Sequence, residues 1–231
     1  RSNDEDLKQL SDNGFDLIVD SSGRKLEDTQ RVLEFTGIPT FRFVYLSSAG
    51  VYANPEFFPL SENTPIDPKS RHIGKANTEF WLKRERIPFT SFRPTYIYGP
   101  GNYNPIESWF FDRITNDRPI PMPGDGQAIT QLGHVSDLAD AIAKSLETEQ
   151  TVNKIYNCSG KKAVSFKGLI ETAALATGRN ISDIKIRSFD PSKLEPKARK
   201  LFPLRLTNFF TDISQLQNDL SWTPKYSLLD G

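Results

Sequence analysis

The sequence predicts an α/β fold, a parallel sheet covered by helices, and two observations support that class. Strand-like apolar runs and helix-like segments alternate along the 231 residues with short connections between them, as in successive strand–helix–strand units. The first run, Phe15–Asp20, is almost continuously apolar, with Gly14 before it and a Ser-Ser-Gly turn after it. Such a run is typical of a strand buried on both faces of a parallel sheet.

Each element in the first half of the chain has a local signal. The helix after the first strand is expected to end near Gly37, because glycine tolerates the left-handed backbone that closes a helix. In order, the predictions are an acidic helix at 4–10 capped by Ser2 or Asn3, the strand at 15–20, a helix at 27–35, a strand at 41–46, a proline-rich loop at 55–68, a helix at 70–84 and a strand at 88–92.

The second half shows the same alternation. Ser136 and Ser165 are the expected N-caps of two helices, since a serine hydroxyl can accept a hydrogen bond from a free backbone N–H of the first turn. The predicted elements are a helix at 104–116, a turn-rich stretch at 119–126, a helix at 135–147, a strand at 154–158, a helix from 165 to a stop at Gly178, a half-buried strand at 183–188 and a short helix at 212–220.

Composition excludes several classes of protein. Lys and Arg (29) balance Asp and Glu (29), which argues against a uniformly basic surface but leaves room for a local patch. Hydrophobic residues make up 37%, enough for a folded core. A single cysteine, Cys158, excludes an intrachain disulfide framework and fits a reducing compartment. No apolar run is long enough to span a bilayer, so no membrane association is expected.

Four segments occur in a characteristic order and spacing: Tyr45-Leu-Ser-Ser-Ala-Gly-Val-Tyr52, Arg93-Pro-Thr-Tyr-Ile-Tyr-Gly-Pro-Gly101, His134-Val-Ser-Asp-Leu-Ala-Asp-Ala141 and Trp222-Thr-Pro-Lys-Tyr226. Together they resemble the extended short-chain dehydrogenase/reductase superfamily, which contains nucleotide-sugar epimerases and dehydratases. The resemblance implies a Rossmann-like core at 1–98 and 131–159, and a smaller substrate-binding-type region at 99–130 and 160–231.

A narrower resemblance is carried by 47–52, 67–72, 98–105, 109–111, 118–121 and 131–135. These segments are similar to the chloroplast stem-loop-binding proteins and their cyanobacterial relatives. The resemblance implies RNA binding, RNA cleavage assisted by a divalent metal, and a location in the cytoplasm or the plastid stroma. It names no metal ligands. Asp137 and Asp140 are expected instead to cap a helix and to favour its dipole.

The superfamily's chemistry needs a Tyr four residues before a Lys on one helix, where the ammonium lowers the pKa of the phenol. By the resemblance, Ser48 and Lys75 match the family's Ser and Lys, but Arg71 stands at the Tyr position. His72 is the nearby group that can titrate, and we predict that it takes part in acid–base chemistry. The alternative is that Arg71 and His72 face solvent or phosphate, while Ser48 satisfies backbone and Lys75 is a surface cation.

Dinucleotide binding needs a glycine-rich turn between the first strand and first helix, and the chain contains none. Either the fold lost the turn, or about 60 residues, an initial strand–helix–strand–strand unit, precede Arg1; we favour the second. NAD(P) binding would require that segment. The family's arginine for a sugar-nucleotide phosphate is replaced as well, since Thr130 and Gln131 stand at its Arg-Asp positions. The remaining contacts implied are Asp20, Ser21, Ser47, Lys75, Pro94 and Thr95; for Ser21 the alternative is an ordinary loop.

Balanced charge hides a basic segment. Residues 179–205 hold eight cations and three anions, a net charge of +5, and such clusters bind phosphate backbones. Aromatic residues Phe189, Phe202, Phe209 and Phe210 lie nearby, where exposed rings would stack on unpaired bases; the alternative is that they are core. A second basic stretch spans 69–86. The predicted RNA-binding residues are Lys193, Lys197, Arg199, Lys200 and Arg205.

Three functions remain open. The leading prediction is an RNA-binding protein that can cleave RNA. The others are an NAD(P)-dependent nucleotide-sugar epimerase or dehydratase and a non-catalytic scaffold, and each is compatible with a homo-oligomer. Trp109, Phe110 and Phe111 are expected mainly in the core, and Cys158 as a buried structural thiol.

Overall fold

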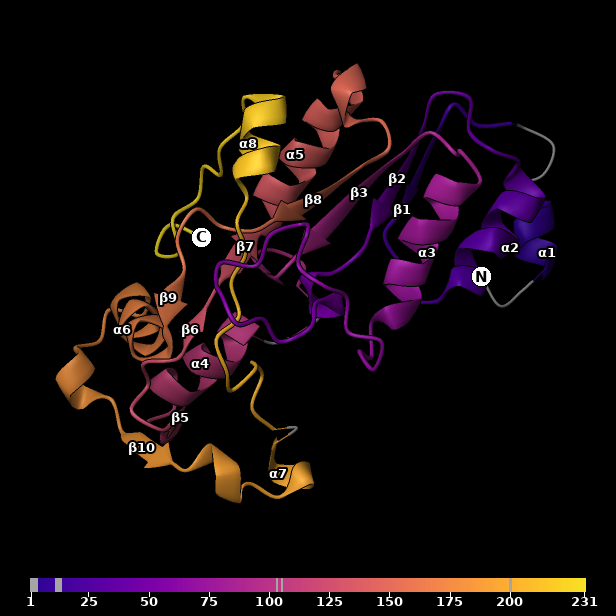
Figure 1. The fold of residues 1–231 in the computed structure, drawn as a ribbon. Helices are drawn as coiled ribbons and strands as arrows, with labels where there is room; N and C mark the ends of the chain where they lie inside the picture. Colours follow the sequence, from indigo (N-terminus) through magenta and orange to yellow (C-terminus); the bar gives the residue numbers. More distant parts are fainter. Residues whose placement is uncertain (1–3, 11–13, 103, 105, 200) are drawn as a thin grey trace. The chain divides into compact units, whose positions relative to one another are not determined.

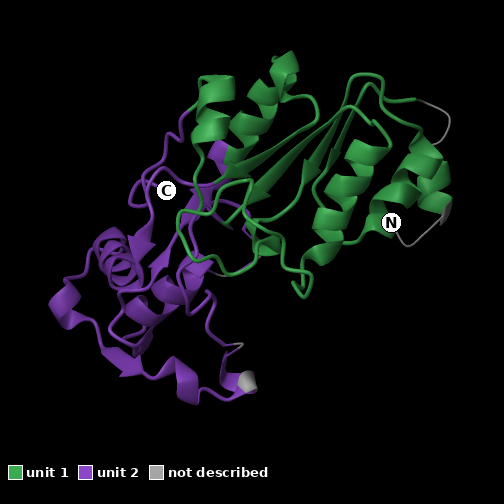
Figure 2. Ribbon diagram, in the orientation of Figure 1, with its two compact units in different colours: residues 1–95, 138–158, 211–222 green, residues 96–137, 159–210, 223–231 purple. Residues whose placement is uncertain are grey.

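The computed structural model describes residues 4–10, 14–102, 104, 106–199 and 201–231, and Figure 1 shows their helices and strands. The predicted helix caps Ser2 and Asn3 lie outside the described residues. The chain forms two compact units, coloured separately in Figure 2. Unit 1 comprises Arg1–Thr95, Leu138–Cys158 and Thr211–Trp222, and unit 2 comprises Tyr96–Asp137, Ser159–Phe210 and Thr223–Gly231.

A four-stranded parallel sheet forms the centre of unit 1, which confirms the predicted α/β class. Its strands are β1 (Leu17–Asp20), β2 (Arg42–Leu46), β3 (Phe89–Pro94) and β8 (Lys154–Cys158), in the order β1-β2-β3-β8. Every residue of β3 is buried, as a parallel strand covered on both faces requires. For β1 the prediction of a doubly buried strand is wrong in the described chain, because Val19 is 47% exposed. In the described sheet β1 pairs with β2 alone.

Helices α2 (Leu26–Thr36) and α3 (Ile73–Arg84) lie side by side in unit 1 (Figure 1). Their Leu33 and Leu82 pack with Phe43 and Phe89 of the sheet in one hydrophobic cluster. Gly37 ends α2 with a φ of 72°, and its N–H donates to the Leu33 carbonyl. Unit 1 also contains α1 (Asp4–Lys8), η1 (Ala49–Val51), η2 (Glu149–Thr151), α8 (Ser214–Leu220) and the greater part of α5 (Val135–Leu146).

The described residues of unit 2 form three two-stranded sheets and short helices. β4 (Tyr96–Tyr98) pairs with β7 (Leu132–His134), β5 (Ile120–Pro123) with β10 (Ile186–Phe189), and β6 (Ile129–Thr130) with β9 (Val164–Ser165). Its helices are α4 (Ile106–Thr115), α6 (Phe166–Ala176), η3 (Ile181–Asp183), η4 (Pro191–Lys193) and α7 (Pro196–Arg199). The stretch predicted as turn-rich therefore includes a strand, because β10, far along the chain, supplies its hydrogen bonds.

The two predicted serine caps have different outcomes. The prediction that Ser165 is an N-cap is confirmed, since its hydroxyl accepts a hydrogen bond from the Gly168 N–H at 3.0 Å. The prediction that Ser136 is an N-cap is wrong, because α5 already begins at Val135. The Ser136 N–H instead donates to Nδ1 of His134 at 3.2 Å, so the imidazole caps the helix.

Asp137 and Asp140, at the start of α5, hold the C-terminal part of the chain. Asp137 accepts the N–H of Lys225 at 2.9 Å and that of Tyr226 at 3.2 Å within unit 2. Within unit 1, Asp140 accepts the indole N–H of Trp222 at 2.9 Å. Capping and the helix dipole, the roles expected from the sequence, do not account for these bonds.

Part of the aromatic run at 109–111 lies in the hydrophobic core of unit 2. Phe110 is buried beside Phe166 and Phe202, while Trp109 is half-buried and Phe111 is exposed. Cys158 is buried at the end of β8, as expected. No helix in the described part of the chain is both long and apolar enough to cross a membrane.

Candidate functional site

The predicted catalytic residues lie in unit 1 beyond the carboxyl end of β2 and at the start of α3. Ser48 caps η1, where its Oγ accepts the Gly50 N–H at 3.0 Å. His72 occupies the N-cap position of α3, with φ −101° and ψ 8°. Because α3 begins at Ile73, Arg71 and His72 precede the helix. Arg71 and Lys75 are four residues apart, but they do not share a helical face, because Arg71 is outside the helix.

Gly50 brings Ser48 and His72 together. A Cβ on Gly50 would stand 2.6 Å from His72 Cδ2, 3.0 Å from His72 Nε2 and 3.1 Å from Ser48 Oγ. The hydroxyl and the imidazole therefore border the same point. Ser70 fixes the turn, because its hydroxyl donates to the Gly50 carbonyl at 2.8 Å and accepts the His72 N–H at 3.0 Å. Arg71 Nε donates to His72 Nε2 at 3.0 Å, which places a cation beside the imidazole.

Lys75, in the first turn of α3, points back to the sheet. Its Nζ donates to the Leu46 carbonyl, the last residue of β2, and lies 5.4 Å from the centroid of the Tyr45 ring. The side chain is half-buried. The alternative of a helix-surface cation is therefore wrong, and the ammonium stands at the same edge of the sheet as Ser48.

Two of the predicted cofactor contacts are buried hydroxyls at the carboxyl ends of adjacent parallel strands. Ser47 follows β2, and Thr95 follows Pro94, the buried last residue of β3. Ser47 Oγ and Thr95 Oγ1 are both buried with no hydrogen-bond partner among the described residues. A buried polar atom without a partner costs about 1–3 kcal/mol. The carboxyl edge of a parallel sheet is also where such folds bind ligands, so these residues fit a polar ligand such as a dinucleotide.

Asp20 is the last residue of β1 and Ser21 follows it, so both lie at the same carboxyl edge of the parallel sheet. Both oxygens of Asp20 accept hydrogen bonds from nearby residues. Oδ1 accepts the N–H of Ser22 at 3.1 Å and of Gly23 at 2.8 Å in the loop, and Oδ2 accepts the hydroxyl of Thr29 in α2 at 3.0 Å. Ser21 is exposed on that loop. Asp20 thus shapes the turn between β1 and α2.

A buried ion pair, which sequence reasoning missed, stands at the end of β3. Arg93 Nη2 lies 2.7 Å from Glu79 Oε2, and the two side chains are 3% and 0% exposed. The Arg93 guanidinium lies 4.9 Å from the centroid of the Tyr52 ring, and the Tyr52 hydroxyl donates to Asn157 at 2.7 Å. Burial raises the pKa of Tyr52 to about 12 although Arg93 opposes the shift. Tyr52 therefore stays a neutral phenol at ordinary pH.

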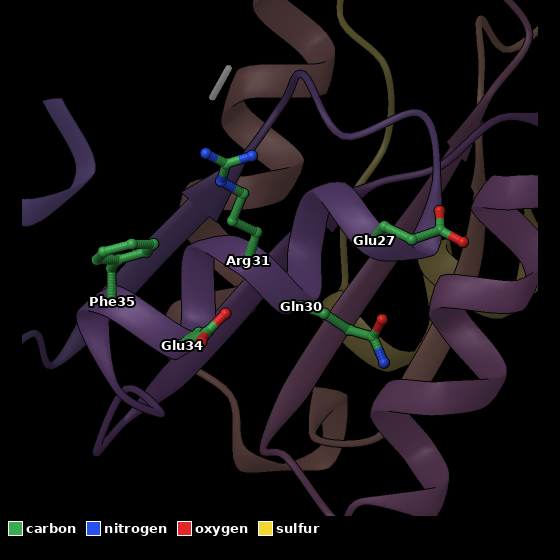
Figure 3. Close-up of a pocket in the computed structure, with 5 residues that line it drawn as sticks. All are labelled: Glu27, Gln30, Arg31, Glu34 and Phe35. Carbon is green, nitrogen blue, oxygen red and sulfur yellow. The ribbon is translucent and has the colours of Figure 1, made fainter. Parts of the chain in front are cut away.

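The outer face of α2 carries a shallow depression that contains none of the predicted site residues. It is lined by Glu27, Gln30, Arg31, Glu34 and Phe35, all from the one helix (Figure 3). Its polar side chains are three or four residues apart and so share one face of the helix, and none of them is a nucleophile. We do not place the candidate site here.

The cations predicted to bind RNA, all in unit 2, separate into two groups. Lys193 and Lys197 are exposed, although Lys193 Nζ lies 3.6 Å from Asp190. Arg199 and Arg205 are half-buried. Lys200 lies outside the described residues.

The half-buried arginines pack against the unit itself. Arg199 donates to the Phe202 carbonyl at 3.4 Å, and the Arg205 guanidinium lies 4.2 Å from the centroid of the Phe209 ring. Phe202 and Phe209 are both buried. The prediction that these two rings are exposed for base stacking is therefore wrong, because their contacts within unit 2 remove them from solvent.

Two further cations of the basic segment stand exposed on or beside β10. Arg187 lies in β10 and Lys185 directly precedes it. Neither of them, nor Lys197, forms an ion pair with a described residue. Arg179 of the same segment is paired with Asp117 at 2.7 Å. The sequence signal that could have identified Lys185 and Arg187 is their place in an alternating strand with polar residues outward.

Thr130 and Gln131, at the positions where the family resemblance expects Arg and Asp, are buried in unit 2. Gln131 Nε2 donates to the Gly160 carbonyl at 2.7 Å. The Thr130 hydroxyl has no partner among the described residues. Among the residues that the structure describes, no three His, Cys, Asp or Glu side chains gather into a metal site.

A family model described as "NAD dependent epimerase/dehydratase family" matches residues 18–159. The "Chloroplast stem-loop binding protein of 41 kDa b, chloroplastic" of Arabidopsis thaliana is 42% identical over 223 residues, covering 96% of this chain and 58% of that protein. The chain spans little more than half the length of several curated relatives it matches.

Solved structures show the same fold. An epimerase from Methanothermobacter thermautotrophicus matches 99% of this chain and 73% of its own, with a TM-score of 0.79 and 17% identity. A UDP-glucuronic acid 4-epimerase from Bacillus cereus, in complex with UDP-glucuronic acid and NAD, matches 98% of this chain and 75% of its own, with a TM-score of 0.77 and 22% identity.

Proposed function

This chain belongs to the NAD dependent epimerase/dehydratase family, and on that premise we propose that it binds RNA stem-loops through exposed cations of unit 2. The observation that carries the proposal is the 42% identity, over 96% of the chain, to a protein whose name states stem-loop binding. The name also states a chloroplast protein, so a plastid stroma location belongs to the same proposal. A fluorescent fusion of the full-length protein tests the location.

The charges of unit 2 support this function. Lys185, Arg187 and Lys197 are exposed and have no described anionic partner. Cations that are not neutralised within the protein remain available to RNA phosphates, and they release counterions when they bind. Arg199 and Arg205 pack against unit 2, so we expect them to contribute less to the interface.

The experiment measures the affinity of a labelled RNA hairpin over a range of salt concentrations. Lys185→Gln with Arg187→Gln is compared with Lys144→Gln plus Lys154→Gln, which removes the same charge from unit 1. We expect the first double variant to weaken binding about tenfold and the control to change it less than twofold. Absence of hairpin binding at low salt would refute the proposed RNA binding. Equal losses of affinity in both double variants would refute the assignment of the binding surface to Lys185 and Arg187.

RNA cleavage is proposed at Ser48, His72 and Lys75, because Gly50 brings the Ser48 hydroxyl and the His72 imidazole to one point. In the proposed step the His72 imidazole takes the proton of an RNA 2′-hydroxyl. That oxygen attacks the adjacent phosphorus, the bond from phosphorus to the 5′-oxygen breaks, and the leaving 5′-oxygen takes a proton from water. Arg71 beside the imidazole supplies positive charge for the phosphate. His72→Gln is expected to lose cleavage of the bound hairpin in Mg²⁺ while keeping its affinity. The control is Lys69→Gln, an exposed neighbour. An unchanged cleavage rate in His72→Gln would remove His72 from the site.

A second candidate function is NAD(P) binding, which the two buried hydroxyls of Ser47 and Thr95 favour. The dinucleotide would supply hydride transfer when bound, and Ser47, Thr95 and Lys75 are the residues proposed to hold it. Binding of NAD to the full-length protein is measured by calorimetry. Ser47→Ala and Lys75→Ala should each weaken binding about tenfold, whereas the exposed control Ser214→Ala should not. Equal affinities in all four proteins would contradict the assignment.

A further inference from the structure

At the carboxyl ends of β5 and β10, unit 2 carries a small surface depression that the RNA-binding proposal does not use. It is lined by Gly124, Ser188, Phe189, Asp190 and Pro191. We propose that this depression receives one unpaired nucleobase of the bound RNA, so that the protein selects hairpin loops over uninterrupted duplex. This inference rests on the proposed RNA binding.

The backbone leaves room for a planar ligand. β5 and β10 are parallel with Phe189 opposite Pro123, and the Gly124 N–H donates to the Phe189 carbonyl at 2.8 Å. Gly124 has a φ of 58°, a left-handed conformation that favours glycine. A Cβ built on Gly124 would meet nothing within 4 Å, so the space above the turn is open.

Phe189 offers an aromatic ring that is held in place. The ring is half-buried and meets the buried Phe202 ring at 6.1 Å between centroids and 68° between planes. This edge-to-face contact fixes the Phe189 ring. Pro191, also half-buried, lines the same depression. Stacking on an ordered ring contributes about 1–3 kcal/mol per base and tolerates every base, because each base has a π-face.

The charges around the depression favour a base inside it and phosphates outside it. Asp190 lines the depression, and hydrogen bonds from Ser192, at 2.7 Å and 3.0 Å to Oδ1, lower the pKa of its carboxyl. A carboxylate repels a phosphate but accepts hydrogen bonds from the amino groups of bases. Cations flank this anion. Lys193 lies beside Asp190, and Arg187 stands exposed in β10 two residues before Phe189.

The experiment compares two RNAs with the same number of nucleotides, a hairpin with 2-aminopurine in its loop and a blunt duplex that has additional base pairs in place of that loop. Ser188→Ile fills the depression from an exposed strand position, and Ser182→Ile is the matched control outside it. Phe189→Leu removes the ring while keeping an apolar contact with Phe202, and urea unfolding checks that both variants fold.

Wild-type protein and Ser182→Ile should bind the hairpin about tenfold more tightly than the duplex and quench the 2-aminopurine fluorescence on binding. Ser188→Ile and Phe189→Leu should lose both the preference and the quenching while their duplex affinity stays unchanged. Wild-type preference and quenching in folded Ser188→Ile and Phe189→Leu would overturn the inference but leave RNA binding intact. No binding of either RNA by wild type at low salt would instead overturn the proposed function itself.

Discussion

The imidazole of His72 lies directly against the α-carbon of Gly50: a Cβ there would stand 2.6 Å from Cδ2 of the ring. Only glycine allows this approach, and the approach places the imidazole beside the Ser48 hydroxyl. The contact joins the turn before α3 to the loop after β2, two segments that the sequence assigned to the site separately.

Gly50→Ala is therefore expected to displace the His72 ring without unfolding unit 1, at a cost of about 1–3 kcal/mol for the overpacked methyl group. The measurement is the NMR signal of the histidine ring, and His134, the only other histidine of the chain, is an internal reference in unit 2. The His72 signal should move and the His134 signal should not. RNA cleavage should fall as far as in His72→Gln. A Gly50→Ala protein with an unshifted His72 signal would contradict the geometry.

The salt dependence of RNA binding should report which cations contact phosphate. Each lost phosphate contact reduces the slope of log affinity against log salt by about 0.9 on duplex and about 0.7 on single strands. Lys185→Gln with Arg187→Gln should thus reduce the slope by about 1.5. Arg205→Gln should leave the slope unchanged and lower the free energy of unfolding by about 0.5–1 kcal/mol, because its guanidinium packs over Phe209. A reduced slope in Arg205→Gln, with an unchanged slope in the Lys185 and Arg187 double variant, would place the interface at Arg205.

The buried pair of Glu79 and Arg93 should dominate the stability of unit 1 near β3. Glu79→Gln leaves a buried guanidinium without its carboxylate, and we expect a loss of about 3–5 kcal/mol in the free energy of unfolding. Adding Arg93→Met should recover much of the loss, because no unpaired charge then remains. Urea denaturation measures both variants. A double variant as unstable as Glu79→Gln alone would show that packing, and not the charge, sets the cost.

Glu62 should make stability depend on pH. Burial raises the pKa of its carboxyl, which accepts the Asn157 N–H at 2.7 Å. The folded state then holds this proton more tightly than the unfolded chain, so the contribution of Glu62 to stability falls as pH rises from the unfolded pKa through the folded one.

Glu62→Gln keeps the oxygen that accepts the hydrogen bond but carries no charge. Its free energy of unfolding relative to wild type should therefore rise between acidic and neutral pH, and urea unfolding at several pH values measures the difference. Glu56→Gln, an exposed neighbour on the same loop, is the control. A constant difference between Glu62→Gln and wild type across that range would contradict the shift.

Elements whose signals are local could be predicted from the sequence. The boundaries of α2, α6 and β8 follow from neighbouring residues, such as the glycine after α2 and Ser165 before α6, and the parallel sheet follows from continuous apolar runs. The motifs also placed Ser47 and Ser48 at a strand end and Lys75 on a helix, because each of these residues lies in or beside a segment that resembles the family.

Contacts between residues far apart in the chain could not be predicted in this way. β5 is a strand because β10 pairs with it, Phe202 and Phe209 are core because unit 2 surrounds them, and the Ser47 and Thr95 hydroxyls are buried without a partner because of what packs around two separate strand ends. The approach of His72 to Gly50 likewise depends on a turn held by Ser70. Secondary-structure propensity and hydrophobic periodicity depend on a few neighbouring residues. The burial of a side chain, the pairing of two strands and the partner of a hydrogen bond depend instead on contacts that form only when the chain folds.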